Sequence, residues 1–380
     1  MKIYQLNKIK NKKEFLKNLK VHGGGVPIMA KKMELLYFQI KDLKTPAVNI
    51  LKQDALSIGA ELATPSGVIT CESESYDCLL VGTRKHIEIL SKKELAQPFG
   101  LKALALELQE FLKVKAYPLK IMGIINANDD SFFEGSRFRD GEAVEKIEQM
   151  IEEGATIIDI GAVSSRPNAD VVSTEIELER IKPICDAIKS KKLYEKVSFS
   201  VDSYTPSVIE YALKSGFNLV NDITGASNDE VVKLAVEYGA KLCIMHMQGT
   251  PQTMQQNPTY DDVMVEISEF FEERIAKCEA FGMKREDIIL DVGIGFGKTL
   301  EHNLTLIKNM GHFKKFGCEV LVGASRKSMI DKVIPTPTQE RLAGTIVIHT
   351  RAVENGASIV RCHDVKEHRQ ALAVLEALDT

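Results

Sequence analysis

The chain has 380 residues, 44% of them hydrophobic and 27% charged, with a formal net charge of −4. This composition excludes a disordered or collagen-like chain, and the near-neutral charge argues against a general nucleic-acid-binding protein. The longest apolar runs have the length of β-strands and fall well short of the roughly 20 residues of a membrane span. The lysine-rich start lacks the apolar stretch of a signal peptide, so we expect a cytoplasmic protein.

The first 115 residues predict a small α+β domain whose boundary falls near Lys113–Pro118. Strands are expected at Met33–Ile40 and Tyr76–Val81, and helices at Val48–Glu61 and Leu101–Lys113. The pattern does not indicate what this domain does. Bracing the second domain, mediating assembly and binding a partner all remain open.

From residue 116 to the end, short apolar runs alternate with amphipathic helical stretches, with about 30 residues in each repeat. The helical stretches include Glu142–Glu153, Glu175–Lys189, Asp261–Phe281 and Leu342–Glu354. The expected strands are Ile121–Ala127, Thr156–Gly161, Val197–Ser203, Leu219–Ile223, Lys241–Met247, Ile288–Gly293, Val320–Ser325 and Ile359–Asp364. Eight such units favour an α/β fold of the (β/α)8 TIM-barrel type over residues 116–380, with an open doubly wound sheet as the alternative.

Polar side chains stand where the predicted strands end, which is where barrel enzymes gather their functional groups. Asp202, Asn221 and Asp291 would act as hydrogen-bond partners in the barrel mouth and suit a flat heterocycle with several N–H donors. Arg361 and His363 are two residues apart on one strand and therefore point to the same side. A purely structural barrel would not need this concentration of polar groups.

A second group of residues suits an anion such as phosphate. Arg166 joins Arg361 and His363 as a candidate anion ligand. Asn126 offers an oxygen ligand to a hard cation such as Mg²⁺ that bridges the phosphate. The stretch Gly297-Lys298-Thr299 resembles the end of a P-loop, but position 292 is Val where that motif needs glycine. We therefore expect these glycines to let the backbone approach a ligand above Asp291.

The seven cysteines show neither a Cys-x-x-Cys pair nor a tight Cys/His cluster. Buried reduced thiols are therefore expected, rather than a disulfide framework or a zinc site. His246 follows an apolar strand and is expected to be a structural histidine with its hydrogen bonds satisfied.

Residues from about 118 to 375 resemble the dihydropteroate synthase family, which has a pterin-binding barrel. The resemblance rests on eight motifs in matching order and spacing: IMGIINANDDSF, IIDIGAVSSRP, SFSVDS, LVNDITG, IMHMQGTP, ILDVGIGFGKT, VGASRKS and VRCHDV. Two loops depart from the family pattern. Asn128-Asp129 replaces Thr-Pro in the first loop, and the second loop lacks the usual Glu before Ser164-Ser165-Arg166.

The resemblance implies a role for each matching residue. Pterin binding would involve Asp202, Asn221, Met245, Asp291, Lys327 and Arg361. The pyrophosphate site would be formed by Asn126, Ser165, Arg166 and His363, with Asn126 as the Mg²⁺ ligand. The para-aminobenzoate site would be lined by Pro167, Phe296 and Ser325. Catalysis would depend on Asp202, Lys327, Arg361 and His363.

The implied reaction condenses 6-hydroxymethyl-7,8-dihydropterin diphosphate with para-aminobenzoate and releases pyrophosphate. We expect the leaving group to depart ahead of attack, with Mg²⁺ and basic residues stabilising it and Asp202 stabilising the positive charge on the pterin. The resemblance also implies a homodimer formed through the last barrel helices. The alternatives are a non-catalytic pterin-binding paralogue and a folate- or corrinoid-linked methyltransferase.

Overall fold

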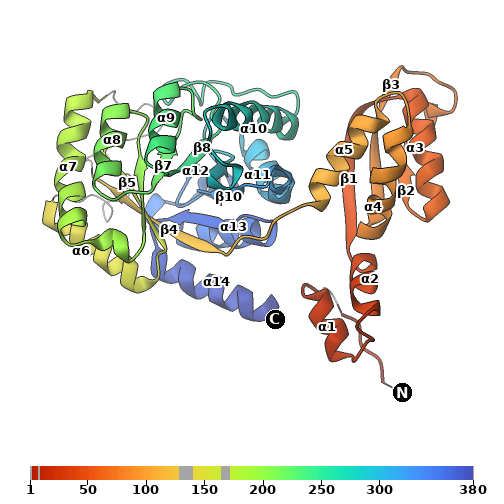
Figure 1. The fold of residues 1–380 in the computed structure, drawn as a ribbon, viewed down its shortest axis with the longest axis horizontal. Helices are drawn as coiled ribbons and strands as arrows, with labels where there is room; N and C mark the ends of the chain where they lie inside the picture. The colour runs from red at the N-terminus through yellow and green to blue at the C-terminus, as the bar shows by residue number, and fades with distance from the viewer. Residues whose placement is uncertain (1, 7–8, 128–139, 164–171, 380) are drawn as a thin grey trace. The chain divides into compact units, whose positions relative to one another are not determined.

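The computed structural model describes residues 2–6, 9–127, 140–163 and 172–379 (Figure 1). The chain divides into two compact units, the first comprising Met1–Val114 with Glu376–Thr380 and the second Lys115–Leu375. Among the described helices, none combines the length and apolar character needed to cross a bilayer.

The first unit contains a three-stranded antiparallel sheet with the strand order β1-β3-β2. Its strands are β1 (Leu35–Lys44), β2 (Glu61–Ala63) and β3 (Ser75–Thr83). Its helices are α1 (Lys12–Asn18), α2 (Gly25–Lys32), α3 (Thr45–Ile58), α4 (Arg84–Lys93) and α5 (Leu101–Leu112). Leu51, Leu80 and Ile87 belong to a separate apolar core in this unit. The predicted α+β class is confirmed, although α1, α2, α4 and β2 were not predicted.

The second unit is a closed barrel of eight parallel strands in the order β10-β11-β4-β5-β6-β7-β8-β9. The strands are β4 (Lys120–Asn126), β5 (Ile157–Gly161), β6 (Ser198–Asp202), β7 (Leu219–Asp222), β8 (Lys241–Met245), β9 (Ile288–Asp291), β10 (Glu319–Val322) and β11 (Ile359–Cys362). This confirms the TIM barrel. β5 ends at Gly161 as predicted, and the other seven strands end one to three residues earlier than predicted, because the ladder stops where the polar loop begins.

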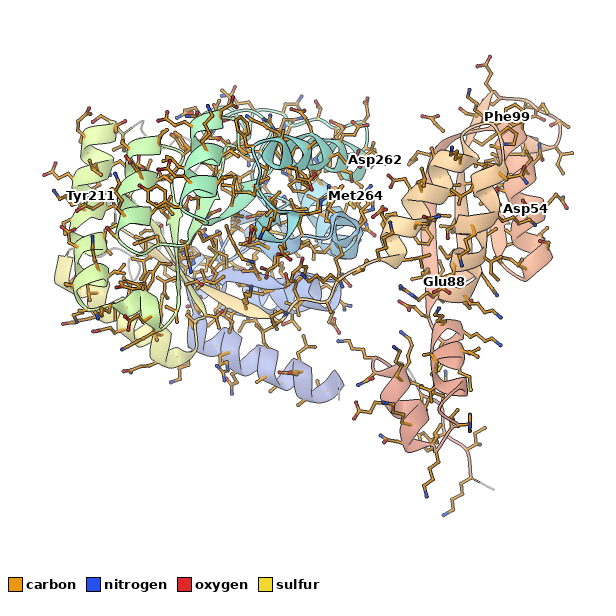
Figure 2. All side chains as sticks on the ribbon, in the orientation of Figure 1. Asp54, Glu88, Phe99, Tyr211, Asp262 and Met264 are labelled. Carbon is orange, nitrogen blue, oxygen red and sulfur yellow. The ribbon has the colours of Figure 1, made fainter. Side chains whose placement is uncertain are left out.

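Helices surround the barrel, as Figure 1 shows. They are α6 (Asp140–Glu153), α7 (Thr174–Ser190), α8 (Pro206–Lys214), α9 (Asp229–Glu237), α10 (Val263–Ala280), α11 (Leu300–Lys308), α12 (Ser328–Val333), α13 (Leu342–Glu354) and α14 (Val365–Asp379). Asp262, labelled in Figure 2, caps α10 by accepting hydrogen bonds from the backbone N–H of Met264 at 2.9 Å and of Val265 at 3.2 Å. This cap sets where α10 begins after the long loop that follows β8.

The barrel interior explains where the polar groups stand. One layer of seven buried side chains fills its centre: Met122, Ile157, Leu219, Cys243, Ile289, Leu321 and Ile359. Side chains two positions further along a strand point to the same interior. On five of these strands that next position holds Asp159, Asn221, Met245, Asp291 and Arg361. The apolar layer therefore forms the floor of a polar site at the carboxyl ends of the strands.

The opposite end of the barrel carries a buried acid, Glu319, at the start of β10. Its carboxylate accepts hydrogen bonds from Lys120 Nζ at 2.6 Å and Lys241 Nζ at 2.7 Å. Burial opposes ionisation, but the two ammonium groups still hold the pKa of Glu319 below 4.5. This cluster links three strands at the end remote from the polar site.

Candidate active site

Arg361, near the end of β11, is the centre of the polar site. Its Nε donates a hydrogen bond to Asp159 Oδ2 at 2.6 Å, and its Nη2 donates to Asp202 Oδ2 at 2.7 Å. Asn221 Nδ2 donates to the same Asp159 oxygen at 3.1 Å. Two carboxylates from β5 and β6 therefore fix the guanidinium across the mouth, and Asp159 also orients the amide of Asn221.

Asp202 has an unusual electrostatic environment. Burial raises the pKa of its carboxyl above the ordinary 3.8, and the negative charge of Asp159 acts in the same direction, while Arg361 opposes both. One guanidinium shared between the fully buried Asp159 and the partly exposed Asp202 does not fully compensate both carboxylates. The ionised form of Asp202 is therefore disfavoured by its surroundings, and a cationic ligand would stabilise it.

Asp291 and Lys327 form the other side of the mouth. Asp291 Oδ1 accepts a hydrogen bond from the backbone N–H of Gly293 at 2.8 Å. Lys327 Nζ donates to the carbonyl of Ile294 at 2.5 Å and lies 4.5 Å from the ring centroid of Phe296. Burial lowers the pKa of Lys327 to about 8, although the charge of Asp291 opposes this shift. The lysine is therefore held beside the acid and the aromatic ring.

Two neighbouring pairs connect the loops after β10 and β11. Ser325 Oγ lies 2.9 Å from His363 Nδ1. The next residues along both loops form a buried ion pair, in which Arg326 Nε and Nη2 donate to the two carboxylate oxygens of Asp364 at 3.0 and 2.7 Å. This forked pair ties the two loops together beside the Ser325–His363 contact.

The remaining predicted residues lie on the first two barrel strands and their loops. Asn126 ends β4, is half-buried and is paired in the ladder with Gly161. The predicted Ser165, Arg166 and Pro167 lie outside the described residues, as do Asn128 and Asp129 of the altered first loop. Within the described ranges, no group of three or more acidic, His or Cys side chains is arranged to hold a metal ion.

The glycine-rich loop after β9 differs from our expectation. Gly293 has φ +66°, and a Cβ there would lie 1.9 Å from the carbonyl oxygen of His246. A Cβ at Gly297, with φ +61°, would lie 2.5 Å from the carbonyl oxygen of Gln248. These glycines are required because the loop packs directly on the backbone that follows β8, rather than for the approach of a ligand.

Lys298, in the same loop, is fully buried and was not predicted to matter. Its Nζ lies 2.9 Å from His246 Nδ1 and donates to the carbonyl of Phe296 at 2.9 Å. Burial lowers the pKa of Lys298 to about 7, and burial together with this lysine lowers that of His246 to about 3. The neutral ring therefore accepts the lysine's hydrogen bond.

Sequence reasoning also missed Asp159 and Glu177. Asp159 is fully buried among isoleucines of β5, and an acid within an apolar strand is a signal that a charged partner faces it. Glu177 on α7 is buried and accepts hydrogen bonds from Ser203 Oγ at 2.6 Å and Thr205 Oγ1 at 2.7 Å. It thereby fixes the loop that follows Asp202.

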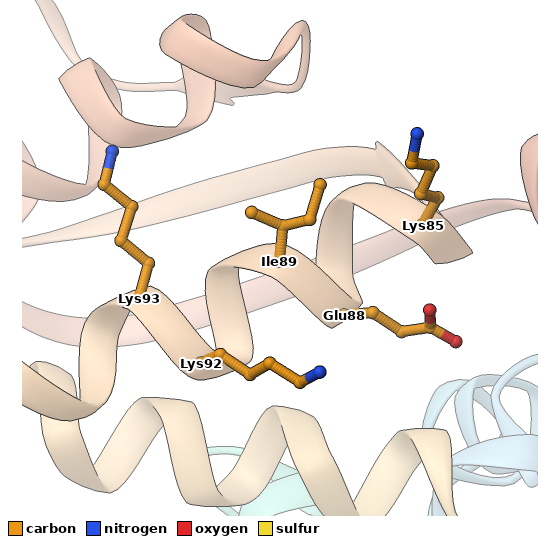
Figure 3. A pocket seen from close by; sticks show the side chains of 5 residues that line it. All are labelled: Lys85, Glu88, Ile89, Lys92 and Lys93. Carbon is orange, nitrogen blue, oxygen red and sulfur yellow. The ribbon is translucent and has the colours of Figure 1, made fainter.

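The first unit has a pocket of its own along α4 (Figure 3). It has a volume of 520 Å³ and is lined by Lys85, Glu88, Ile89, Lys92 and Lys93. Three ammonium groups against one carboxylate make this pocket positively charged. Lys93 also pairs with Asp54 at 2.8 Å, which leaves Lys85 and Lys92 as the exposed cations without an acid partner among the described ion pairs.

Comparison with known proteins relates both units to other chains. A family model described as "Pterin binding enzyme" matches residues 122–363. The bifunctional dihydropteroate synthase/dihydropteroate reductase of Helicobacter pylori is 43% identical over 343 residues, which are 90% of this chain and 90% of that protein. The dihydropteroate synthase of Escherichia coli K12 is 43% identical over 258 residues, covering 68% of this chain and 90% of its own. A crystal structure of the Yersinia pestis dihydropteroate synthase with a sulfonamide drug complex is 38% identical, covers 69% of this chain and 94% of its own, and has a TM-score of 0.66.

Proposed function

We propose roles for individual residues on the premise that this chain belongs to the pterin-binding enzyme family, among the dihydropteroate synthases. It is therefore a transferase of folate biosynthesis, which joins 6-hydroxymethyl-7,8-dihydropterin diphosphate to para-aminobenzoate with release of pyrophosphate. The methyltransferase and the non-catalytic paralogue are not favoured. The observation that carries the residue assignment is the polar layer centred on Arg361.

The pterin ring binds in the barrel mouth between the acids and amides of that layer. Asp202, Asn221 and Asp291 present oxygen atoms to the N–H groups of the heterocycle, and Lys327 donates to its polar edge. Asp159 Oδ1 is a buried acceptor with no hydrogen-bond partner in the described part of the chain. An unpaired buried acceptor is costly, so it supports a ligand donor at this position.

Pyrophosphate departure requires stabilisation of two opposite charges. The exocyclic methylene and the pterin become electron-poor as the C–O bond breaks, and the carboxylate of Asp202 stabilises that positive charge. His363, with Ser165 and Arg166, binds the departing pyrophosphate. The amine of para-aminobenzoate, seated beside Pro167, Phe296 and Ser325, then attacks the methylene and loses a proton, so no nucleophilic side chain is needed. Met245 and Arg361 complete the pterin pocket, with Arg361 over one face of the ring.

Asn126 fits a role as a magnesium ligand. Mg²⁺ prefers oxygen ligands and is commonly held by one or two protein groups together with substrate phosphates and water. The amide oxygen of Asn126 at the end of β4 is such a group, and the lack of a larger acidic cluster within the described ranges is consistent with a metal that arrives with the diphosphate. Bound there, Mg²⁺ would neutralise charge on the leaving pyrophosphate.

Pyrophosphate release tests this assignment. The purified protein is given the dihydropterin diphosphate with and without para-aminobenzoate and Mg²⁺, and release is expected only with both. We expect Arg361→Ala and His363→Ala to lower kcat/KM by at least about 100-fold, because each removes charge stabilisation from the transition state. Turnover unchanged in both variants would contradict the assignment.

We also propose a homodimer formed through the last barrel helices. Exposed apolar side chains on and beside α12, α13 and α14 support it: Val333, Ile334, Val347 and Val374. Light scattering of the eluted protein should give twice the mass of 42.2 kDa, and Val347→Lys should reduce this measured mass.

We also propose a cytoplasmic location, which the cysteines support. All seven are free thiols and six of them are buried, whereas Cys71 is exposed, contrary to the expected burial.

A second function is suggested by the relative that is named for two activities. Its alignment with this chain is longer than the barrel unit and therefore extends into the first unit, whereas the Escherichia coli alignment of 258 residues is no longer than the barrel unit. We propose that the first unit takes part in reducing 7,8-dihydropteroate, which adds a hydride to C6 and a proton to N5. The lysines lining the α4 pocket suit the phosphate groups of a hydride-donor cofactor.

Reduction is tested with dihydropteroate and two donor classes, a reduced nicotinamide and a reduced flavin. Chromatography should show tetrahydropteroate with at least one donor. The double variant K85E/K92E should reduce this activity while leaving pyrophosphate release unchanged. Absence of product with either donor would contradict the second function and leave the first intact.

A further inference from the structure

Two buried histidines outside the substrate site connect its two anion-side loops. The backbone N–H of Ala324 donates to His349 Nε2 at 2.9 Å. His349 Nδ1 lies 2.9 Å from His368 Nε2, and His368 Nδ1 lies 2.6 Å from the carbonyl oxygen of Asp364. Neither ring is more than 1% exposed. The hydrogen bonds thus run without a break from the loop after β10, through α13 and α14, to the loop after β11. We call this connection through His349 and His368 the bridge.

The two ends of this bridge fix the proton on each ring. A backbone N–H can only donate, so His349 Nε2 must be an unprotonated acceptor and its proton must lie on Nδ1. That proton makes His368 Nε2 an acceptor in turn, so His368 carries its own proton on Nδ1 and donates it in a hydrogen bond to the carbonyl oxygen of Asp364. Both rings are therefore neutral Nδ1–H tautomers, assigned from the network of partners.

In the loop after β10, helix α13 supplies the acceptors for two backbone N–H groups. Arg326 lies beyond the end of β10 at Val322 and has a left-handed backbone with φ +55°, so the chain turns here outside the strand ladder. The N–H of Arg326 donates to Thr345 Oγ1 at 2.9 Å. Thr345 and His349 are one turn apart on α13, so one helical face holds the N–H groups at both positions 324 and 326.

Each end of the bridge lies next to a residue assigned to the site. Ala324 precedes Ser325, and Asp364 follows His363, while Ser325 and His363 contact each other at 2.9 Å. We propose that His349 and His368 are positioning residues of the synthase, which hold Ser325 and His363 in register for the anion and the arylamine. This proposal rests on the assigned roles of Ser325 and His363.

Charged groups around the bridge favour neutral rings. Burial lowers the pKa of His349 well below 6.5, and His368, Lys327 and His363 add to the shift. Burial also lowers the pKa of His368; Arg326 acts in the same direction, while Asp364 and Glu367 oppose it. Protonating His349 would place an N–H against the N–H of Ala324. The stability that the neutral rings provide is therefore full above pH 6.5 and is lost as the pH falls below it.

The tautomers can be observed in the unmodified protein. With ¹⁵N-labelled histidine, long-range ¹H–¹⁵N spectra distinguish Nδ1–H, Nε2–H and charged rings among the eight histidines. Two rings are expected to remain neutral Nδ1–H tautomers from pH 8 to below pH 6, and His349→Gln and His368→Gln identify their signals. A charged or Nε2–H ring at either position at pH 7 would overturn the proposal, whatever the activity of the variants.

Kinetics with a matched pair of variants test the positioning role. His349→Gln keeps an oxygen for the N–H of Ala324, whereas His349→Leu removes the acceptor. At pH 8 we expect His349→Leu to lower kcat by about 10- to 100-fold and to raise KM for para-aminobenzoate, because a small displacement of reacting groups is costly. His349→Gln should retain most of the activity, and the Kd for the dihydropterin should be unchanged in both.

Equal kinetics in the two variants, or weakened pterin binding in both, would indicate a structural role only and overturn the proposal. If His349→Leu does not fold, thermal unfolding provides a second test. The natural protein should have a higher Tm than His349→Gln at pH 7.5, and this difference in Tm should shrink as the pH falls to 5. Ser325→Ala tests the underlying site separately, since it should lower activity without changing either histidine tautomer.

Discussion

The most consequential single residue outside the predicted set is Asp159. It shares Arg361 with Asp202, orients the amide of Asn221 and keeps one oxygen without a partner among the described groups. Sequence reasoning selected Asp202, Asn221 and Asp291 because each stands at a strand end. Asp159 stands within a strand, and only the closure of the barrel shows that this position faces Arg361.

Replacing Asp159 by Asn should change the pH dependence of the reaction in a defined direction. Its negative charge contributes to the raised pKa of Asp202, after the larger effect of burial. Asp159→Asn should lower that pKa, so Asp202 stays ionised to lower pH. We expect kcat/KM to fall by about tenfold at neutral pH and its acid limb to move to lower pH. Asp261→Asn, at an exposed position, should leave the profile unchanged.

Gly293 and Gly282 form a matched pair for a second prediction. Both have a positive φ, of +66° and +91°, but only at Gly293 would a Cβ meet another backbone atom. Gly282→Ala should lower the free energy of unfolding by about 1–2 kcal/mol from backbone strain alone. Gly293→Ala adds a clash with the carbonyl of His246 and should lower the free energy of unfolding, measured by urea titration, at least twice as much as Gly282→Ala does. Equal losses of unfolding free energy in the two variants would show that the loop after β8 shifts to accommodate the added methyl group.

At the scale of elements, the repeating pattern of the barrel was predictable and the small domain less so. Each barrel strand is a buried apolar run, so its boundaries follow from hydrophobicity to within three residues. Helix α4 was missed because RKHIEILSKK is mostly polar and its start depends on a capping box between Thr83 and His86. The bridge of His349 and His368 was also beyond prediction, because its members lie on two helices and two loops that are separated in the sequence.

Glu319 should stabilise the barrel without affecting its chemistry. Glu319→Gln leaves Lys120 and Lys241 without their shared acid and should lower the free energy of unfolding by about 3 kcal/mol. The pKa of Glu319 is lowered from 4.5, so this contribution is present above pH 4.5 and fades as the pH falls below it. Glu195→Gln, at an exposed pair, is the control. A large loss of kcat in folded Glu319→Gln would contradict the separation between the two barrel ends.

At the scale of the whole molecule, the two units have separate cores. The barrel clusters begin at Ile121, and the clusters of the first unit end at Leu108. A chain lacking residues 1–114 should therefore fold and keep the kcat and KM values of the synthase, while losing any reductase activity. Unfolding curves and pyrophosphate release measure the first outcome. A folded barrel with no synthase activity would show that the first unit contributes to this reaction.

The position of Arg361 near the end of the chain has a consequence for biosynthesis. It lies 202 residues after Asp159 and 159 residues after Asp202, and β11 closes the barrel by pairing with β4. On a ribosome adding about 5–20 residues per second, the first barrel strands wait on the order of 10–50 s for β11 to emerge. The edge of β4 that pairs with β11 is open during that interval, whereas the local sheet of residues 35–83 can already fold. The nascent barrel is therefore the stage at which this protein most needs a chaperone.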